Sequence, residues 1–401
     1  MWSTRGRRRP NRPALVRSPI ALSAASVVTT IRFLPRWSRG SLGQYTGVVR
    51  STEAPATEAA LVTLDEIRAA AVRLRGVTIV TPLLPFQTRA ASSVGGEAQP
   101  HAAAARSSPR FWLKPESLQP IGAFKLRGAY NAISLLSEER RAAGVVTHSS
   151  GNHAQGVARA ARLLGVRAVI VMPRNAPAVK VRGVQADGAE IVWVGASSEE
   201  RAATAHELAQ GEGLSLVPPY DDAGVIAGQG TVGLEIVQQL AELDAARAPL
   251  TVLVPVGGGG LAAGVATAVK SLRPDAVVLG VEPALAADAR ESLAAGQIVR
   301  WDPALTGRTI ADGMRTASIG KLPFQHLRRF LDGVLAVEEE EIVKAVATAA
   351  ERARLVLEPS GATALAAALF HDRELPEPGL VVAILTGGNV DPDRYRELLA
   401  L

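Results

Sequence analysis

The stretch TVLVPVGGGGLAAGV, residues 251–265, joins three kinds of local structure without a break. A run of apolar and β-branched residues ends in four consecutive glycines, residues 257–260, and a helical pattern starts at Leu261. A strand, a glycine loop and a helix N-terminus together direct backbone N–H groups and the helix-end field at an anion. Four glycines in a row are costly in entropy unless a ligand must approach the backbone closely. The stretch predicts a phosphate-binding turn; the alternative is a tight strand-to-helix turn that binds nothing.

Apolar segments recur on both sides of this stretch and alternate with helical patterns. They span residues 145–147, 168–172, 191–194, 214–217, 251–256, 276–281 and 380–385. Strands of this kind, separated by helices, are typical of a parallel sheet with helices on both faces. The glycine loop lacks both the spacing of a dinucleotide fingerprint and the Lys-Ser/Thr pair of a nucleoside-triphosphate loop. We therefore expect an α/β fold that binds a single phosphate group.

Two such α/β units fit the length of 401 residues. We expect a smaller domain of residues 143–222, inserted into a larger domain made of residues 61–142 and 223–401. Ligands bind at the carboxyl ends of parallel strands, so the site should lie in the cleft between the two domains. A capped helix is expected to open the larger domain just after Thr63, and residues 99–108 are typical of a surface loop insertion.

The net charge of +6 is concentrated at one end of the chain. Residues 1–60 contain ten arginines and two acids, Glu53 and Glu58, whereas the rest is nearly neutral. We expect these residues to form a disordered basic extension: a transit peptide, an export signal or translated sequence upstream of a misassigned start. The neutral remainder argues against nucleic-acid binding. With no cysteine and no apolar run of about 18 residues, thiolate chemistry and a membrane span are not expected, and we expect a soluble, cytoplasmic protein.

A phosphate-bearing cofactor that reacts with amines needs a lysine. The candidates are Lys114, Lys125, Lys180, Lys270, Lys321 and Lys344. Lys125 differs from the others because it lies in the segment GAFKLRGA, residues 122–129, whose small and apolar neighbours could desolvate its amine. Taken alone, this lysine is more consistent with a solvated surface charge than with a Schiff base, because lysines in helix-opening segments are usually solvated.

Several motifs, taken together, resemble the serine/threonine dehydratase and serine racemase family. These are pyridoxal 5′-phosphate enzymes that share the fold of the tryptophan synthase β-subunit, called fold type II. The resemblance covers residues 61–398. Its motifs are GAFKLRGA at 122–129, THSSGNHAQG at 147–156, VIAGQGT at 225–231, the glycines at 257–260, VEP at 281–283, TIADG at 309–313 and LTGGN at 385–389.

The resemblance implies a role for each matching position. Lys125 would form the Schiff base with the cofactor, Phe124 would pack beside its ring, and Asn152 would contact its 3′-oxygen. Thr386 would place a hydroxyl at the pyridine nitrogen, where the family commonly has serine. The cofactor phosphate would be bound by Gly257, Gly258, Gly259, Gly260 and the Leu261 amide. The substrate carboxylate would be bound by the loop of Ser149, Ser150, Gly151, Asn152 and His153.

The reaction implied is α,β-elimination from L-threonine or L-serine. The freed amine of Lys125 would remove the α-proton, the β-hydroxyl would leave, and hydrolysis would give a 2-oxo acid and ammonia. A hydroxyl rather than a carboxylate at the ring nitrogen favours this elimination. Ser150 permits serine racemisation as well, because serine racemases use this hydroxyl as a base. Dehydration of 3-hydroxyaspartate is a further alternative. A non-catalytic amino-acid- or phosphate-binding module is disfavoured by the intact Lys125, Asn152 and glycine loop.

Two further expectations concern assembly and regulation. A homodimer is the family's usual state. We expect no feedback inhibition through a C-terminal regulatory domain, because the sequence has no such module after Leu401.

A cation site is also implied by the resemblance. Glu282, the carbonyl of Ala286 and Asp288 match the family's ligands for a divalent cation, and such hard oxygen donors suit Mg²⁺, Ca²⁺ or Mn²⁺. The chain departs from the family at Ala287, where a further acid is common. The alternative is an acid at a strand end and a helix-capping Asp288.

Overall fold

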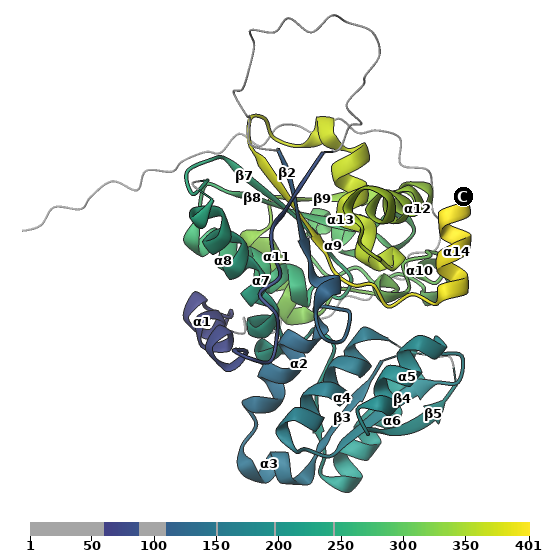
Figure 1. The fold of residues 1–401 in the computed structure, drawn as a ribbon. Helices are drawn as coiled ribbons and strands as arrows, with labels where there is room; N and C mark the ends of the chain where they lie inside the picture. Colours follow the sequence, from purple (N-terminus) through teal and green to yellow (C-terminus); the bar gives the residue numbers. More distant parts are fainter. Residues whose placement is uncertain (1–59, 88–109, 150, 196–197, 244) are drawn as a thin grey trace, which may run out of the picture. The chain divides into compact units, whose positions relative to one another are not determined.

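The computed structural model describes residues 60–87, 110–149, 151–195, 198–243 and 245–401 (Figure 1), all within the compact unit of residues 47–401. The basic extension, the expected loop insertion at 99–108 and Ser150 lie outside the described residues. The first described helix, α1, begins at Leu64 and is capped as its sequence predicts. The Thr63 hydroxyl accepts from the backbone N–H of Glu66, and the Glu66 carboxylate accepts from the backbone N–H of Thr63.

A six-stranded sheet has the order β1-β2-β10-β7-β8-β9. Its strands are β1 Leu84–Phe86, β2 Phe111–Pro115, β7 Leu250–Pro255, β8 Val277–Pro283, β9 Gly333–Val337 and β10 Leu380–Leu385. Only the β1–β2 pair is antiparallel among these strands; the other pairs are parallel, and Val382 of β10 lies opposite Val252 of β7. The carboxyl ends of β7 and β10 therefore meet at one edge.

Helices cover both faces of this sheet (Figure 1). Side chains alternate between the faces of a strand, so Val252 and Val382 pack in one core with α7, α8 and α11. Leu253 and Val381 pack in a second core with α12 and α13. Strands buried on both faces explain why the sequence shows continuous apolar runs here.

A four-stranded parallel sheet has the order β5-β4-β3-β6. Its strands are β3 Val145–His148, β4 Ala168–Pro173, β5 Glu190–Val194 and β6 Ser215–Leu216. Val145 and Ile170 pack against α2 and α4 on one face, and Val146 packs against α6 on the other. All four strands fall inside residues 143–222, the range expected for the smaller domain, although the boundaries themselves stay a prediction.

The helices connect these strands. The α-helices are α1 Leu64–Arg73, α2 Lys125–Ser134, α3 Glu138–Ala143, α4 Asn152–Leu164, α5 Ala178–Ala186, α6 Ser198–Glu212, α7 Ala223–Glu242, α8 Gly260–Leu272, α9 Asp288–Ala295, α10 Pro303–Thr306, α11 Lys321–Phe330, α12 Glu339–Thr348, α13 Pro359–Phe370 and α14 Pro392–Ala400. The short 3₁₀ helices η1 Glu116–Leu118 and η3 Asp312–Met314 also matter below.

The α/β class and the parallel sheets are confirmed, and each of the seven expected strands is present within two residues of its expected bounds. The apolar pattern did not predict β1, β2 and β9. β1 is only three residues long, and β2 carries Lys114 and Pro115, which interrupt an apolar pattern.

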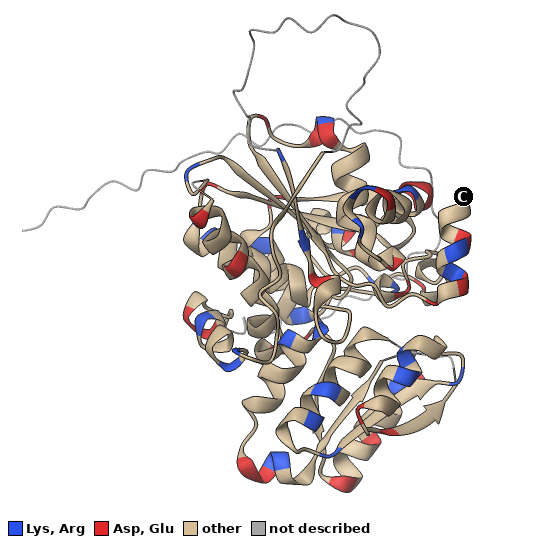
Figure 2. Cartoon of the chain, in the orientation of Figure 1, with Lys and Arg blue, Asp and Glu red and all other residues tan. Residues whose placement is uncertain are grey.

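Basic and acidic residues are interspersed over the helices of both sheets (Figure 2), as a nearly neutral body requires. Among the described residues, no helix is both long and apolar enough to cross a membrane.

Candidate active site

A cavity of about 830 Å³ is lined by segments that follow the carboxyl ends of the parallel strands. The residues expected to bind the cofactor or the substrate, Ser150 excepted, all line it. They are Phe124, Lys125, Ser149, Gly151, Asn152, His153, Gly257, Gly258, Gly259, Gly260, Leu261 and Thr386. Four separate stretches of sequence, drawn from both sheets, therefore share one cavity.

Lys125 is the first residue of α2, and its side chain is partly buried in this cavity. Its Nζ donates to the carbonyl of Pro219 at 2.8 Å and lies 5.1 Å from the centroid of the Phe124 ring. Burial lowers the pKa of Lys125 to about 8, because an ammonium loses hydration there. The amine can therefore be neutral near physiological pH, as a nucleophile or a base must be.

The glycine loop links β7 to α8 and leaves no room for a side chain at Gly258, Gly259 or Gly260. Gly259 has φ +91°, a left-handed conformation that favours glycine. A Cβ on Gly258 would overlap the ring of Tyr220, and one on Gly260 would lie 2.9 Å from the Tyr220 Cα. The loop thus presents bare backbone at the N-terminus of a 13-residue helix, which is a suitable place for a phosphate.

Asn152 opens α4 and is held from two sides. Its Nδ2 donates to Oε1 of Glu358, and its Oδ1 accepts from Nδ2 of Asn389 at 2.8 Å. Glu358 precedes α13, while Asn389 follows β10 and also donates to the carbonyl of Ile121. The amide of Asn152 is therefore fixed in orientation at the wall of the cavity.

A second lysine, Lys180 of α5, also lines the cavity. Its Nζ lies 2.6 Å from Oδ2 of Asp312 and 3.1 Å from Oε2 of Glu358. Burial alone would lower the pKa of Lys180, but the carboxylates of Glu358 and Asp312 raise it above its usual value. Burial raises the pKa of Glu358, and Lys180 partly offsets that effect. Lys180 was one of six candidate lysines but was not expected at the site, and Glu358 was not predicted from the sequence. Asp312 lies in the TIADG motif, which could have pointed to it.

Two other expected site residues make hydrogen bonds within the protein. His153 is buried, its Nε2 lies 2.9 Å from the carbonyl of Val217, and burial together with the nearby Lys125 lowers its pKa to about 3. His153 is thus a neutral side chain that holds the loop. The Thr386 hydroxyl donates to the carbonyl of Ser360 at 3.2 Å, so it offers the cavity a polar group without charge.

The candidate cation residues lie at the end of β8. The Glu282 carboxylate accepts from the backbone N–H groups of Ala289 and Arg290 at 3.0 and 2.8 Å. Asp288 is fully buried, and neither of its carboxylate oxygens has a partner among the described residues. Its side chain makes no cap of α9, so the expected alternative of a capping aspartate does not hold. Burial raises the pKa of both carboxyls. Within the described residues no group of three or more His, Cys, Asp or Glu side chains is arranged so that it could hold a metal ion.

A family model of pyridoxal-phosphate dependent enzymes matches residues 98–387. The chain belongs to this family. It is 42% identical over 295 residues to the L-threo-3-hydroxyaspartate ammonia-lyase of Saccharomyces cerevisiae, covering 74% of this chain and 87% of that protein. It is 37% identical over 340 residues to the serine racemase of Schizosaccharomyces pombe, covering 85% and 98%. The crystal structure of a threonine deaminase from T.th. superposes with a TM-score of 0.72 at 43% identity, covering 82% of this chain and 99% of that one.

These similarities confirm the expected family and fold type, and with them the dependence on pyridoxal phosphate. The residues of this pyridoxal-phosphate enzyme fit the cofactor. The glycine loop presents backbone at positions where a Cβ would clash with Tyr220, Ile319 or Pro323, and Lys125 supplies an amine whose pKa is lowered. An aldehyde needs such an amine, and a phosphate needs such a loop.

Proposed function

We propose that this enzyme is an ammonia-lyase that converts L-threonine, L-serine or both to 2-oxo acids and ammonia. The observation that carries the proposal is the partly buried amine of Lys125, with a pKa of about 8, in the cavity that also holds the glycine loop. The relatives named as a threonine deaminase and as an ammonia-lyase support it. Pyridoxal phosphate, when bound, withdraws electrons from the α-carbon of an amino acid.

The chain's own residues would divide the remaining work. The backbone of the glycine loop and the amide of Leu261 would hold the phosphate, while Phe124 packs beside the ring. Asn152, fixed by Glu358 and Asn389, would contact the 3′-oxygen. Thr386 would place an uncharged hydroxyl beside the pyridine nitrogen. Because no carboxylate would hold a proton on that nitrogen, it would be largely unprotonated. This favours loss of a β-substituent over extended carbanion chemistry.

Substrate binding and proton removal would fall to the loop before α4 and to Lys125. The loop of Ser149, Ser150, Gly151, Asn152 and His153 would bind the carboxylate at the N-terminus of α4, where backbone donors and the helix field favour an anion. The neutral amine of Lys125 would then accept the α-proton at its Nζ. Ser150 could supply a second base, so racemisation of serine is a further activity to be tested.

A dicarboxylic substrate is a second candidate, because several arginines line the cavity. These are Arg201, Arg300 and Arg315. Arg300 pairs with Glu199, and Arg315 donates to the carbonyl of Thr309. A β-carboxylate, as in 3-hydroxyaspartate, would therefore share these side chains with their present partners. The similarity to the yeast L-threo-3-hydroxyaspartate ammonia-lyase supports this substrate as well.

The experiment is a substrate panel. Purified enzyme is incubated separately with L-threonine, L-serine, D-serine and L-threo-3-hydroxyaspartate, and 2-oxo acid, ammonia and chirality are measured. We expect 2-oxo acid with threonine or serine and none with a Lys125→Ala variant. Formation of D-serine without 2-oxo acid would favour the racemase, and turnover of 3-hydroxyaspartate alone would favour the dicarboxylate.

Two further features are proposed with the function. Glu282, the Ala286 carbonyl and Asp288 would bind a divalent cation such as Mg²⁺. The cation would be a partner for the oxygens of Asp288, which accept no hydrogen bond from the described residues. We also propose a homodimer, which analytical ultracentrifugation of the purified chain would test.

A further inference from the structure

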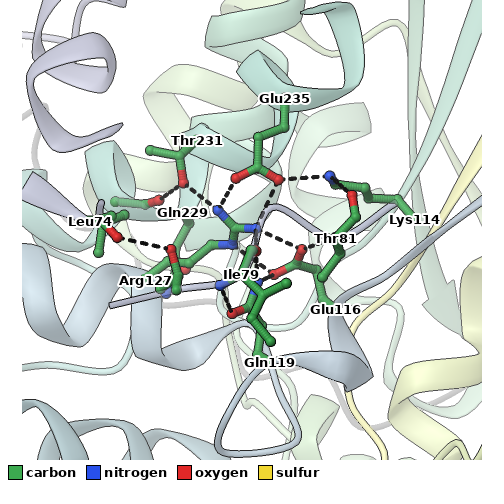
Figure 3. A network of polar contacts seen from close by, with 12 residues as sticks. Leu74, Ile79, Thr81, Lys114, Glu116, Gln119, Arg127, Gln229, Thr231 and Glu235 are labelled. Carbon is green, nitrogen blue, oxygen red and sulfur yellow. Dashed lines mark hydrogen bonds and ion pairs between the residues drawn. The ribbon is translucent and has the colours of Figure 1, made fainter. Parts of the chain in front are cut away.

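Four charged side chains are buried together beside the helix that carries Lys125 (Figure 3). They are Lys114 of β2, Glu116 of η1, Arg127 of α2 and Glu235 of α7, and we refer to them as the four-charge cluster. Lys114, Glu116 and Arg127 have no exposed surface, and Glu235 is nearly buried. Charged groups are rarely buried unless they are paired, and none of these four side chains touches the cofactor or substrate in the reaction proposed above.

Arg127 is at the centre of the cluster and uses every nitrogen of its guanidinium. Its Nε and Nη2 donate to the two oxygens of Glu116 at 2.7 and 2.9 Å. Its Nη1 and Nη2 donate to the two oxygens of Glu235 at 2.5 and 2.9 Å. Nη1 also donates to the Thr231 hydroxyl and Nη2 to the carbonyl of Ile79. Two carboxylates held in this bidentate way fix the orientation of the guanidinium.

Lys114 of β2 and the neighbouring polar groups of Thr81 and Gln119 complete the hydrogen bonds of the two glutamates. Lys114 Nζ donates to Glu235 at 2.7 Å and to the carbonyl of Thr81 at 2.6 Å. The Thr81 hydroxyl and Gln119 Nε2 donate to Glu116 (Figure 3). Glutamates from two different elements, η1 and α7, therefore clamp one side of α2. Two cations and two carboxylates leave the cluster without net charge.

Lys125 and Arg127 are two residues apart on a helix. At 3.6 residues per turn their side chains point about 200° apart, so Lys125 faces the cavity while Arg127 faces the cluster. The backbone between them is enclosed as well. A Cβ on Gly156 of α4 would lie 3.1 Å from the Lys125 carbonyl, and one on Gly228 of α7 would lie 2.5 Å from the carbonyl oxygen of Arg127. The first turn of α2 has little freedom to rotate.

We propose that Arg127 is a positioning residue for Lys125: by bridging Glu116 and Glu235 it fixes the rotation of α2 and so aims the Lys125 amine into the cavity. The inference rests on the proposed function in so far as Lys125 is the base. Placement errors of about 1 Å can cost about 100-fold in rate. The cluster therefore acts on the reaction through the geometry of the amine and not through contact with substrate or cofactor.

The test uses the holoenzyme and an Arg127→Lys variant. This change keeps the positive charge, so no carboxylate is left without a counter-ion, but an ammonium cannot bridge two carboxylates in two parallel pairs. The thermal midpoint, cofactor content, the pH midpoint of the cofactor's visible absorption band, kcat, KM and the effect of α-deuterated substrate on kcat are measured. Rates are expressed per cofactor-bearing site. Lys270→Met, which breaks the partly exposed ion pair with Asp332 away from the cavity, is the control.

We expect kcat per cofactor-bearing site to fall about 100-fold in Arg127→Lys, with KM nearly unchanged, a larger isotope effect and a displaced pH midpoint. A purely structural role would lower the thermal midpoint and the cofactor content of Arg127→Lys, and it would leave the pH midpoint, kcat, KM and the isotope effect at wild-type values, as we expect for the control. That result would overturn the proposal. If Arg127→Lys does not fold, the double variant Arg127→Met with Glu116→Gln retains a neutral cluster through Lys114 and Glu235.

The absorption midpoint separates this proposal from the proposed function, because it needs no substrate. Arg127→Lys could displace the pH midpoint of the absorption band even if the wild-type enzyme turns over none of the four amino acids. That result would contradict the ammonia-lyase activity and support the positioning role of Arg127. An unchanged midpoint with normal turnover per site would overturn the positioning role of Arg127 and support the ammonia-lyase activity.

Discussion

Lys125 and Lys180 line the same cavity, yet the pKa of Lys125 is lowered and that of Lys180 is raised. Both amines are removed from bulk water, so the difference comes from their partners. Lys125 Nζ contacts a neutral carbonyl, that of Pro219, whereas Lys180 Nζ lies against the carboxylates of Asp312 and Glu358. An uncompensated ammonium loses its proton readily, and a paired one keeps it. The protein thus separates a reactive amine from a permanent cation within one site.

Borohydride reduction of the holoenzyme is expected to attach the cofactor to Lys125 and not to Lys180. Only a neutral amine attacks an aldehyde, and the two carboxylates keep Lys180 protonated. Peptide mapping by mass spectrometry identifies the modified lysine. Lys125→Ala should lose the adduct, and label on Lys180 in the wild-type enzyme would contradict the assignment.

Recombination of the cofactor-free protein with pyridoxal phosphate should become faster as pH rises and level off above about pH 8. The pKa of Lys125, about 8, is lowered by burial, so about a quarter of the amine is neutral at about pH 7.5, against about one part in a thousand for an ordinary lysine. Stopped-flow absorbance at a series of pH values gives the midpoint. A midpoint near about pH 10 would show that the amine is not desolvated.

Gly258→Ala is expected to weaken cofactor binding. The added methyl group would overlap the Tyr220 ring, so either the ring or the loop must move. Overpacking of this kind costs about 1–3 kcal/mol, equivalent to about 5- to 150-fold in the dissociation constant. Gly211→Ala in α6 is the control, because its methyl group would meet nothing within 4 Å. Equal affinities for the two variants would contradict the tight packing at the loop.

How much of this site the sequence could predict depends on how local its parts are. Lys125, Asn152 and the glycine loop each lie in a compact motif that resembles the same family, so it was predictable that they share one cavity. Lys180 and Glu358 were missed because they meet only in the folded chain, 178 residues apart. Arg127 and Glu116 belong to types that are usually solvated. Their burial depends on β2, a strand that the apolar pattern does not show.

Removing divalent cations with a chelator is expected to lower the thermal midpoint, and Mg²⁺ should restore it. Two buried carboxylates, Glu282 and Asp288, repel each other without a cation, and burial raises the pKa of both. Asp288→Asn should abolish the response to Mg²⁺ and, in chelator, be at least as stable as the wild type. Differential scanning calorimetry measures the thermal midpoints of the wild type and of Asp288→Asn, each with chelator and with Mg²⁺. A wild-type thermal midpoint that changes with neither reagent would contradict the cation site.

Lys180→Met is expected to move activity toward alkaline pH. Burial raises the pKa of Glu358 and the ammonium of Lys180 lowers it, so loss of Lys180 raises the pKa of Glu358 further. Glu358 accepts a hydrogen bond from Asn152, and an ionised carboxylate is the better acceptor. If the ionised form orients Asn152, the variant needs a higher pH to reach the active state, and kcat/KM falls at neutral pH.

Profiles of kcat/KM from about pH 6 to about pH 10 for Lys180→Met and for Lys180→Arg, which keeps the cation, measure the shift. Lys180→Arg should retain a nearly wild-type profile. Superimposable profiles for Lys180→Met and the wild type would show that Lys180 does not control the ionisation of Glu358.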